Sequence, residues 1–151
     1  MHFYTSKNEK SSTFEEIFKI LPMNVHNLST NSKKTLVIGA SENPERYSNK
    51  AVKMLHEYRH EVVALGKEKD KNINGLPIVN AVENSEKFDT ITLYLNPKNQ
   101  EPYYEQIIEL KPRRVIFNPG TENPAFEETL KQHNIEPIEA CTLVMLRTNQ
   151  F

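Results

Sequence analysis

The chain has 151 residues, a common size for one domain and enough to bury a hydrophobic core without disulfide bonds. Its formal net charge of −1 at pH 7 provides no overall positive field that would hold a nucleic acid or an anionic membrane surface. Cys141 is the only cysteine, which excludes an internal disulfide and a metal site with several thiolates and is typical of a reducing cytoplasm.

The first 33 residues are richer in polar side chains than the rest and are predicted to form an N-terminal extension, residues 1–33. Phe14, Ile17, Phe18 and Leu21 recur at helical spacing, which predicts one short helix at 14–21. The extension lacks the continuous apolar region of a secretory signal, and no stretch approaches the roughly 18 apolar residues of a membrane span. The sequence therefore predicts a cytoplasmic protein.

Residues 34–151 alternate short apolar runs with helical patterns. Strands are predicted at 35–38, 62–65, 76–79, 91–95, 115–117 and 135–138. Helices are predicted after the first, fourth and fifth runs, marked by Ala51, Met54, Leu55 and Tyr58, by Tyr104, Ile107 and Ile108, and by residues 125–133. This alternation predicts an α/β fold, a doubly wound parallel sheet of the Rossmann type, in a single domain.

Such folds bind ligands beyond the carboxyl ends of their strands, where the strand order reverses. The loops at that edge read GASENPERYS, GKEKDKNING, NPKNQEP and NPGTENP. Two of them carry an Asn-Pro pair at the same place, directly after the strand, Asn96-Pro97 and Asn118-Pro119, and proline steers the chain away from an immediate helix. Either pair alone would simply end a strand, whereas two in corresponding places indicate a shaped pocket.

The first loop has a single glycine, Gly39, followed by Ala40 and Ser41, where a dinucleotide site would carry three glycines. Gly39 can supply a tight turn, and the small side chains leave room for phosphate oxygens. The missing glycines argue against the close pyrophosphate packing of a nicotinamide dinucleotide.

Arg46, Tyr47 and Ser48 stand at the start of the helix that follows, and a helix N-terminus favours an anion. Arg46 is a candidate for a charge-assisted hydrogen bond to phosphate. The alternative is that Arg46 is a solvated surface residue and that Ser48 only caps the helix.

The second loop begins Gly66-Lys67, where an NAD site would carry an acidic residue for the ribose hydroxyl. A lysine suits a ribose phosphate instead. Alternatively, Lys67 is one of several exposed lysines in this loop, together with Lys69 and Lys71.

The segments VIGASENPERYSNKAVKMLHEYRHEVVALGK, ITLYLNP, RRVIFNPGTENP and IEACTLVML resemble the stand-alone bacterial CoA-binding domain proteins. That family is related to the CoA-binding domain of the succinyl-CoA synthetase α subunit. The resemblance covers residues 34 to about 147 and implies that CoA lies across the carboxyl edge of the sheet. The second domain of the synthetase, with its phosphorylated histidine, has no counterpart here, so synthetase activity is not implied.

The resemblance also implies residue roles. It places Gly39, Ala40 and Ser41 under the pyrophosphate with Arg46, Tyr47 and Ser48 beside it, Gly66 and Lys67 near the ribose 3′-phosphate, and Leu95, Asn96, Pro97, Asn118, Pro119 and Gly120 beside the pantetheine arm.

A catalytic constellation is not evident. Cys141 is a weak candidate for exchange with the CoA thiol, although a lone cysteine beside apolar residues is more often an inert, buried side chain. His56 and His60 are the only histidines at a metal-ligand spacing, and His60 falls where a helix should end, so no metal site is predicted.

The sequence thus favours a module that binds coenzyme A or an acyl-CoA through phosphate-binding loops, without catalysis of its own. The alternatives are an NADP-dependent oxidoreductase, since Lys67 would also suit a ribose 2′-phosphate, and a Rossmann-like interaction protein with a vestigial pocket. The expected partner is this small molecule, and a homo-oligomer or a protein partner stays open.

Overall fold

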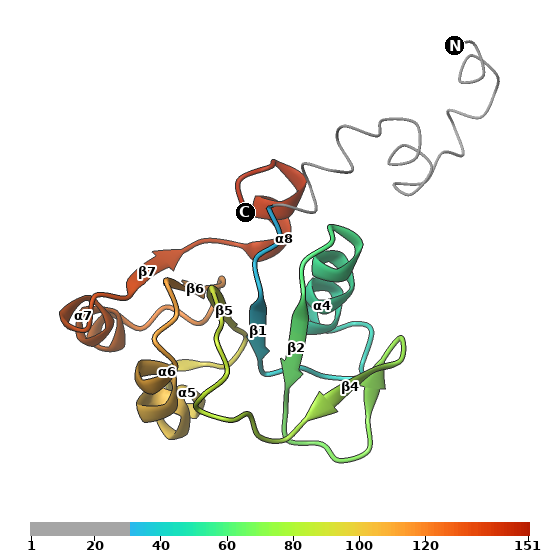
Figure 1. Cartoon of the computed structure of the whole chain (residues 1–151), viewed down its shortest axis with the longest axis horizontal. Coiled ribbons are helices and arrows are strands. Elements are labelled where there is room, and N and C mark those ends of the chain that lie inside the picture. The colour runs from blue at the N-terminus through green and yellow to red at the C-terminus, as the bar shows by residue number, and fades with distance from the viewer. Residues whose placement is uncertain (1–30) are drawn as a thin grey trace, which may run out of the picture. The chain divides into compact units, whose positions relative to one another are not determined.

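The computed structural model describes residues 31–151 (Figure 1). Residues Lys33–Phe151 form one compact unit. The predicted helix at 14–21 lies outside the described residues, and the predicted domain boundary after residue 33 stays a prediction.

A seven-stranded sheet runs through this unit in the order β3-β4-β2-β1-β5-β6-β7. The strands are β1 (Thr35–Ile38), β2 (Val62–Leu65), β3 (Asn72–Ile73), β4 (Leu76–Val79), β5 (Thr90–Leu93), β6 (Arg114–Phe117) and β7 (Glu136–Glu139). The six strands predicted from the sequence are therefore present, each with its ends close to the predicted ones. The prediction of a doubly wound fold of the Rossmann type is confirmed.

Strand β3 is the one element of the sheet that the sequence did not predict, and it pairs antiparallel with β4. The two strands are joined by Asn74 and Gly75, both with positive φ, which is the conformation of a tight hairpin turn. The Asn72 side chain accepts a hydrogen bond from the N–H of Gly75 at 3.0 Å and fixes this turn. The other strand pairs are parallel.

The order of the strands reverses at β1, which pairs with β2 on one side and with β5 on the other. Their last residues are in register, with Ile38 opposite Leu65 and opposite Leu93. The loops after β1, β2 and β5 therefore leave the sheet at the same edge, which is where a doubly wound sheet binds its ligand.

Helices cover both faces of the sheet (Figure 1). They are α4 (Tyr47–Glu57), α5 (Pro97–Gln100), α6 (Tyr104–Leu110), α7 (Pro124–Gln132) and α8 (Thr142–Arg147), with a short 3₁₀ helix, η2 (Glu101–Tyr103), between α5 and α6. The predicted helices correspond to α4, α6 and α7. Helices α5 and α8 are too short to give a recognisable apolar period.

Two apolar clusters form the core, one on each face of the sheet. Ile107 of α6 and Phe126 of α7 belong to the first cluster, whereas Leu55 of α4 and Leu146 of α8 belong to the second. All of the residues of β1 and β5 are buried, as expected for central strands of a sheet covered on both faces.

Strand β7 stands last in the sheet. The N–H groups of Glu136 and Ala140 donate to carbonyls on the β6 side, those of Arg113 and Phe117. Because successive backbone N–H groups of a strand point to opposite sides, the backbone nitrogens of Pro137 and Glu139 face away from β6.

None of the helices in residues 31–151 is long and apolar enough to cross a membrane.

Candidate functional site

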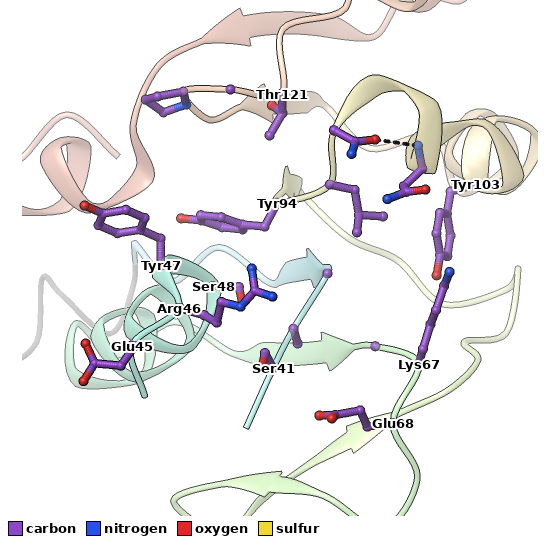
Figure 2. A pocket seen from close by; sticks show the side chains of 18 residues that line it. Ser41, Glu45, Arg46, Tyr47, Ser48, Lys67, Glu68, Tyr94, Tyr103 and Thr121 are labelled. Atoms are coloured by element: carbon purple, nitrogen blue, oxygen red, sulfur yellow. Dashed lines mark hydrogen bonds between the residues drawn. The ribbon is translucent and has the colours of Figure 1, made fainter. Parts of the chain in front are cut away.

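A cleft of about 770 Å³ opens at the carboxyl edge of the sheet, over the point where the strand order reverses (Figure 2). It is lined by Gly39, Ala40, Ser41, Glu45, Arg46, Tyr47, Ser48, Gly66, Lys67, Glu68, Tyr94, Leu95, Asn96, Asn99, Tyr103, Pro119, Gly120 and Thr121. The structure therefore brings together the residues predicted to form the site, apart from Pro97 and Asn118, which do not line the cleft.

Gly39 makes the tight turn after β1. Its φ is +96°, and a Cβ at this position would lie 3.0 Å from the carbonyl oxygen of Tyr94. The N–H groups of Gly39 and Ala40 both donate to the carbonyl of Leu65, each at 3.0 Å. A residue with a side chain would be strained here and would push away the chain that follows β5, so glycine is required.

The rest of the first loop is held by Asn49, a residue of α4 that is buried. Its Nδ2 donates to the carbonyl oxygens of Ser41, at 3.0 Å, and Glu42, at 3.1 Å. The Ser41 hydroxyl in turn accepts from the N–H of Asn43. The loop thus has a defined shape without the further glycines of a dinucleotide site.

The N-terminus of α4 opens into the cleft. Arg46 is the N-cap residue, with an extended backbone, and no side chain caps the helix. The first N–H groups of a helix lack intrahelical acceptors and carry a partial positive charge, so this end favours an anion. Arg46 is exposed, and its side chain extends into the cleft (Figure 2). The alternative reading of Ser48 as the N-cap is wrong, because Ser48 lies within the helix.

The loop after β2 packs directly against the first loop. Gly66 is buried, and its N–H donates to the carbonyl of Val79. The Asn80 amide donates to the carbonyls of Gly66, at 2.9 Å, and Glu68, at 3.0 Å, which fixes the backbone on both sides of Lys67. The Lys67 side chain is exposed and extends toward Tyr103 across the cleft (Figure 2).

The loop after β5 begins α5. Asn96 is the N-cap, and its Oδ1 accepts from the N–H of Asn99 at 2.9 Å. Pro97 is the first residue of the helix, a position where its missing N–H costs nothing. It therefore helps to set the direction of the loop, whereas Leu95, Asn96 and Asn99 line the cleft.

Asn118 lies beneath the cleft and is almost fully buried. Its Nδ2 donates to the carbonyl of Leu93 at 2.9 Å and to the hydroxyl of Thr92, and its Oδ1 accepts from the N–H of Thr142 at 2.8 Å. Asn118 therefore does not line the cleft, and its side chain joins β5, β6 and α8.

The lining residues that the sequence did not predict are Glu45, Glu68, Tyr94, Asn99, Tyr103 and Thr121. Tyr94 falls inside the strand predicted at 91–95, but β5 ends at Leu93 and Tyr94 is the residue that follows it. Its place near the carboxyl end of the predicted strand was the signal that could have identified it. Its hydroxyl is buried, and burial raises the pKa of the phenol.

Charge divides the cleft into two parts. Its charged lining residues are Glu45, Arg46, Lys67 and Glu68, and they all come from the loops after β1 and β2. We call this part the charged half. The lining residues of the loops that follow β5 and β6, from Tyr94 to Tyr103 and from Pro119 to Thr121, are uncharged. We call this part the neutral half.

Cys141 is half-buried, precedes α8 and does not line the cleft. His56 is exposed on α4, whereas the Nδ1 of His60 accepts from the N–H of Lys33 at 3.0 Å. Burial, together with the charges of Lys33 and Arg114, lowers the pKa of His60 to about 4. No cluster of His, Cys, Asp and Glu side chains within residues 31–151 has the arrangement of a metal site.

Comparisons with known proteins give the family and support the fold. A family model described as a CoA binding domain matches residues 33–147. A crystal structure of an uncharacterized protein is 46% identical, with a TM-score of 0.77, and covers 80% of this chain and 98% of its own. A hypothetical protein from Pyrococcus horikoshii OT3 is 26% identical, with a TM-score of 0.66, over 90% of this chain and 92% of its own.

A further structure, of cell-free ID.343 from Thermus thermophilus, has a TM-score of 0.70 and covers 85% of this chain and 98% of its own. Its identity is 20%, so this similarity concerns the fold alone. Among curated proteins, none matches the chain.

Proposed function

Since this chain belongs to the family of CoA-binding domains, we propose that it binds coenzyme A or an acyl-CoA in the cleft at the carboxyl edge, without a reaction of its own. The observation that carries the proposal is the division of the cleft into a charged half and a neutral half. Coenzyme A has the same division, because an anionic nucleotide is joined to an uncharged, amide-containing pantetheine arm.

The pyrophosphate would lie over the first loop, at the start of α4. Gly39, Ala40 and Ser41 leave room for its oxygens, and the uncapped N–H groups of α4 point into the same space. The Arg46 guanidinium, flanked by Tyr47 and Ser48, would add charge-assisted hydrogen bonds.

The ribose 3′-phosphate would lie against Gly66 and Lys67. The backbone at Lys67 is fixed by the two hydrogen bonds of Asn80, so the ammonium group is presented from a rigid base. A cation at this place favours a phosphorylated ribose over the free hydroxyl of NAD. Glu68, next in the chain, also lines this part and would disfavour further negative charge.

The pantetheine arm would follow the neutral half, beside Leu95, Asn96, Pro119 and Gly120. Asn96 offers a side-chain amide, and the small Gly120 leaves the backbone accessible to the amides of the arm. Pro97 and Asn118 would shape this wall from outside the cleft.

We further propose a cytoplasmic location and a relationship to the CoA-binding domain of the succinyl-CoA synthetase α subunit. Cys141 is assigned no role in this function, since it lies outside the cleft lining.

Thermal unfolding with separate additions of CoA, acetyl-CoA, NADP and NAD tests the proposal. A ligand at 100 times its Kd stabilises the folded state by about 2.7 kcal/mol. Stabilisation by CoA or acetyl-CoA is the expected result. Stabilisation by NADP alone would favour an oxidoreductase, and no effect of any ligand would favour an interaction protein with a vestigial pocket.

A further inference from the structure

One side chain links the two loops of the neutral half. Gln100, the last residue of α5, is completely buried. Its Nε2 donates to the carbonyl of Leu95 at 2.8 Å and to the carbonyl of Thr121 at 2.8 Å. Leu95 belongs to the loop after β5 and Thr121 to the loop after β6, and both line the cleft.

We propose that Gln100 is a positioning residue that sets the spacing of the neutral half and thereby controls affinity for the uncharged arm of the ligand, separately from its nucleotide end. This inference rests on the proposed function and adds to it a residue that does not touch the ligand.

The orientation of the Gln100 amide is fixed by its neighbour Asn123. The Asn123 Oδ1 caps α7 by accepting from the N–H of Phe126 at 3.2 Å, so its Nδ2 must point the other way. That Nδ2 donates to the Oε1 of Gln100 at 2.9 Å and to the hydroxyl of Tyr104 at 2.8 Å. The Gln100 NH₂ group is consequently the one that faces the two carbonyls.

Both N–H groups of the amide and its oxygen have partners, which makes it a specific link and not a mere filling of space. A buried carbonyl that loses its donor is costly, and here two would lose theirs together. The two loops would then separate, or admit water, at the wall where the arm lies.

The charged half has braces of its own. Asn49 holds the loop after β1 through the carbonyls of Ser41 and Glu42, and Asn80 holds the loop after β2 through those of Gly66 and Glu68. Neither brace involves Gln100. A change at Gln100 should therefore leave binding of the nucleotide end largely intact.

The decisive variant is Gln100→Glu, which keeps the size of the side chain and the acceptor for Asn123 but places a carboxylate oxygen opposite the carbonyls of Leu95 and Thr121. Calorimetry measures Kd for CoA and for adenosine 3′,5′-bisphosphate, which lacks the arm. The expected result is a loss of about tenfold or more in affinity for CoA and less than about twofold for the bisphosphate, from the cost of unpaired buried carbonyls.

Gln106→Glu is the matched control. The Gln106 Nε2 also bridges two groups, the carbonyl of Val82 and the Oδ1 of Asn84, each at 2.9 Å, and Gln106 does not line the cleft. This variant should bind both ligands as the wild type does. Equal losses of CoA and bisphosphate affinity in Gln100→Glu, or unchanged CoA affinity, would overturn the inference.

Hydrogen exchange on the wild type tests the same point should Gln100→Glu fail to fold. CoA should slow exchange in residues 94–100 and 118–123 as well as in 39–48 and 66–68, whereas the bisphosphate should slow it only in 39–48 and 66–68. Protection of 94–100 by the bisphosphate contradicts the inference. A wild type that binds CoA but shows neither pattern defeats this inference alone, whereas one that does not bind CoA defeats the proposed function as well.

Discussion

Gly66 packs against the main-chain carbonyl of Ala40 so closely that a Cβ at position 66 would lie 2.5 Å from the carbonyl oxygen. The same Cβ would lie 3.0 Å from the Cγ2 of Ile78. Gly66 does not have a positive φ, so the requirement for glycine is one of space and not of backbone conformation. This contact brings the loops after β1 and β2 together in the charged half.

Gly66→Ala is expected to push these loops apart. Overpacking at such a contact costs about 1–3 kcal/mol of unfolding free energy. CoA affinity should fall as well, since Ala40 and Lys67 would move relative to each other. Chemical denaturation and calorimetry measure the two effects, and an alanine variant with wild-type stability would contradict the close contact.

Lys67→Ala is expected to lower the affinity for CoA about 10- to 100-fold, because a charge-assisted hydrogen bond is lost. The affinity for dephospho-CoA, which lacks the ribose 3′-phosphate, should fall much less. Lys69→Ala is the matched control, because Lys69 is exposed in the same loop but does not line the cleft. Equal losses for CoA and dephospho-CoA would show that Lys67 is placed wrongly.

Arg46→Gln should behave differently from Lys67→Ala. If the guanidinium serves the pyrophosphate, CoA and dephospho-CoA should both weaken by a similar factor, about tenfold or more. Lys98→Gln removes a cation from α5 that is close in sequence to lining residues but does not line the cleft, and should change neither affinity. A selective loss of CoA alone would instead assign Arg46 to the 3′-phosphate.

His60 is expected to make stability depend on pH. Its pKa in the folded state is lowered to about 4 from an ordinary value of 6.5, chiefly by burial. The unfolded chain therefore takes up the proton first as pH falls, so stability present above pH 6.5 is lost between about pH 6.5 and 4. The loss is on the order of 1–2 kcal/mol, because the half-exposed ring is partly screened by solvent.

His60→Asn tests this dependence, since an asparagine oxygen can still accept from the N–H of Lys33 but does not titrate. The unfolding free energy, measured by denaturation across this pH range, should depend less on pH in His60→Asn. The exposed His56→Asn should keep the pH dependence of the wild type. An unchanged slope in His60→Asn would exclude His60 as the cause.

The sequence was sufficient to predict the six parallel strands of the sheet and the edge at which the cleft opens. The strands of the sheet are short buried runs, each followed by a polar loop. Because parallel strands end at the same edge of the sheet, these loops lie together there. Gly39 and Lys67 were identifiable because each stands at a fixed place after its strand. The hairpin of β3 was missed because two residues give no period, although Asn74-Gly75 was a turn signal.

The direction of individual side chains was harder to predict. Asn118 follows Phe117, which packs in the cluster with α6 and α7, so its own side chain turns to the other face and meets Thr142 of α8. An Asn-Pro pair in the sequence does not show whether the asparagine side chain is buried in this way or lines the cleft. Gln100 was not identifiable for the same reason, since a polar residue in a segment predicted as a loop gives no sign that it is completely buried.

The proline of β7 has a consequence for assembly. A sheet that ends in a strand with free N–H groups offers a template on which another chain can add a strand. Pro137 occupies a position whose backbone N–H would point outward, so one hydrogen-bond donor is missing from the free side of β7. The exposed carboxylates of Glu136 and Glu139 stand on either side of this position. Propagation of the sheet from one molecule to the next is therefore opposed at this border, both by a missing hydrogen bond and by like charges.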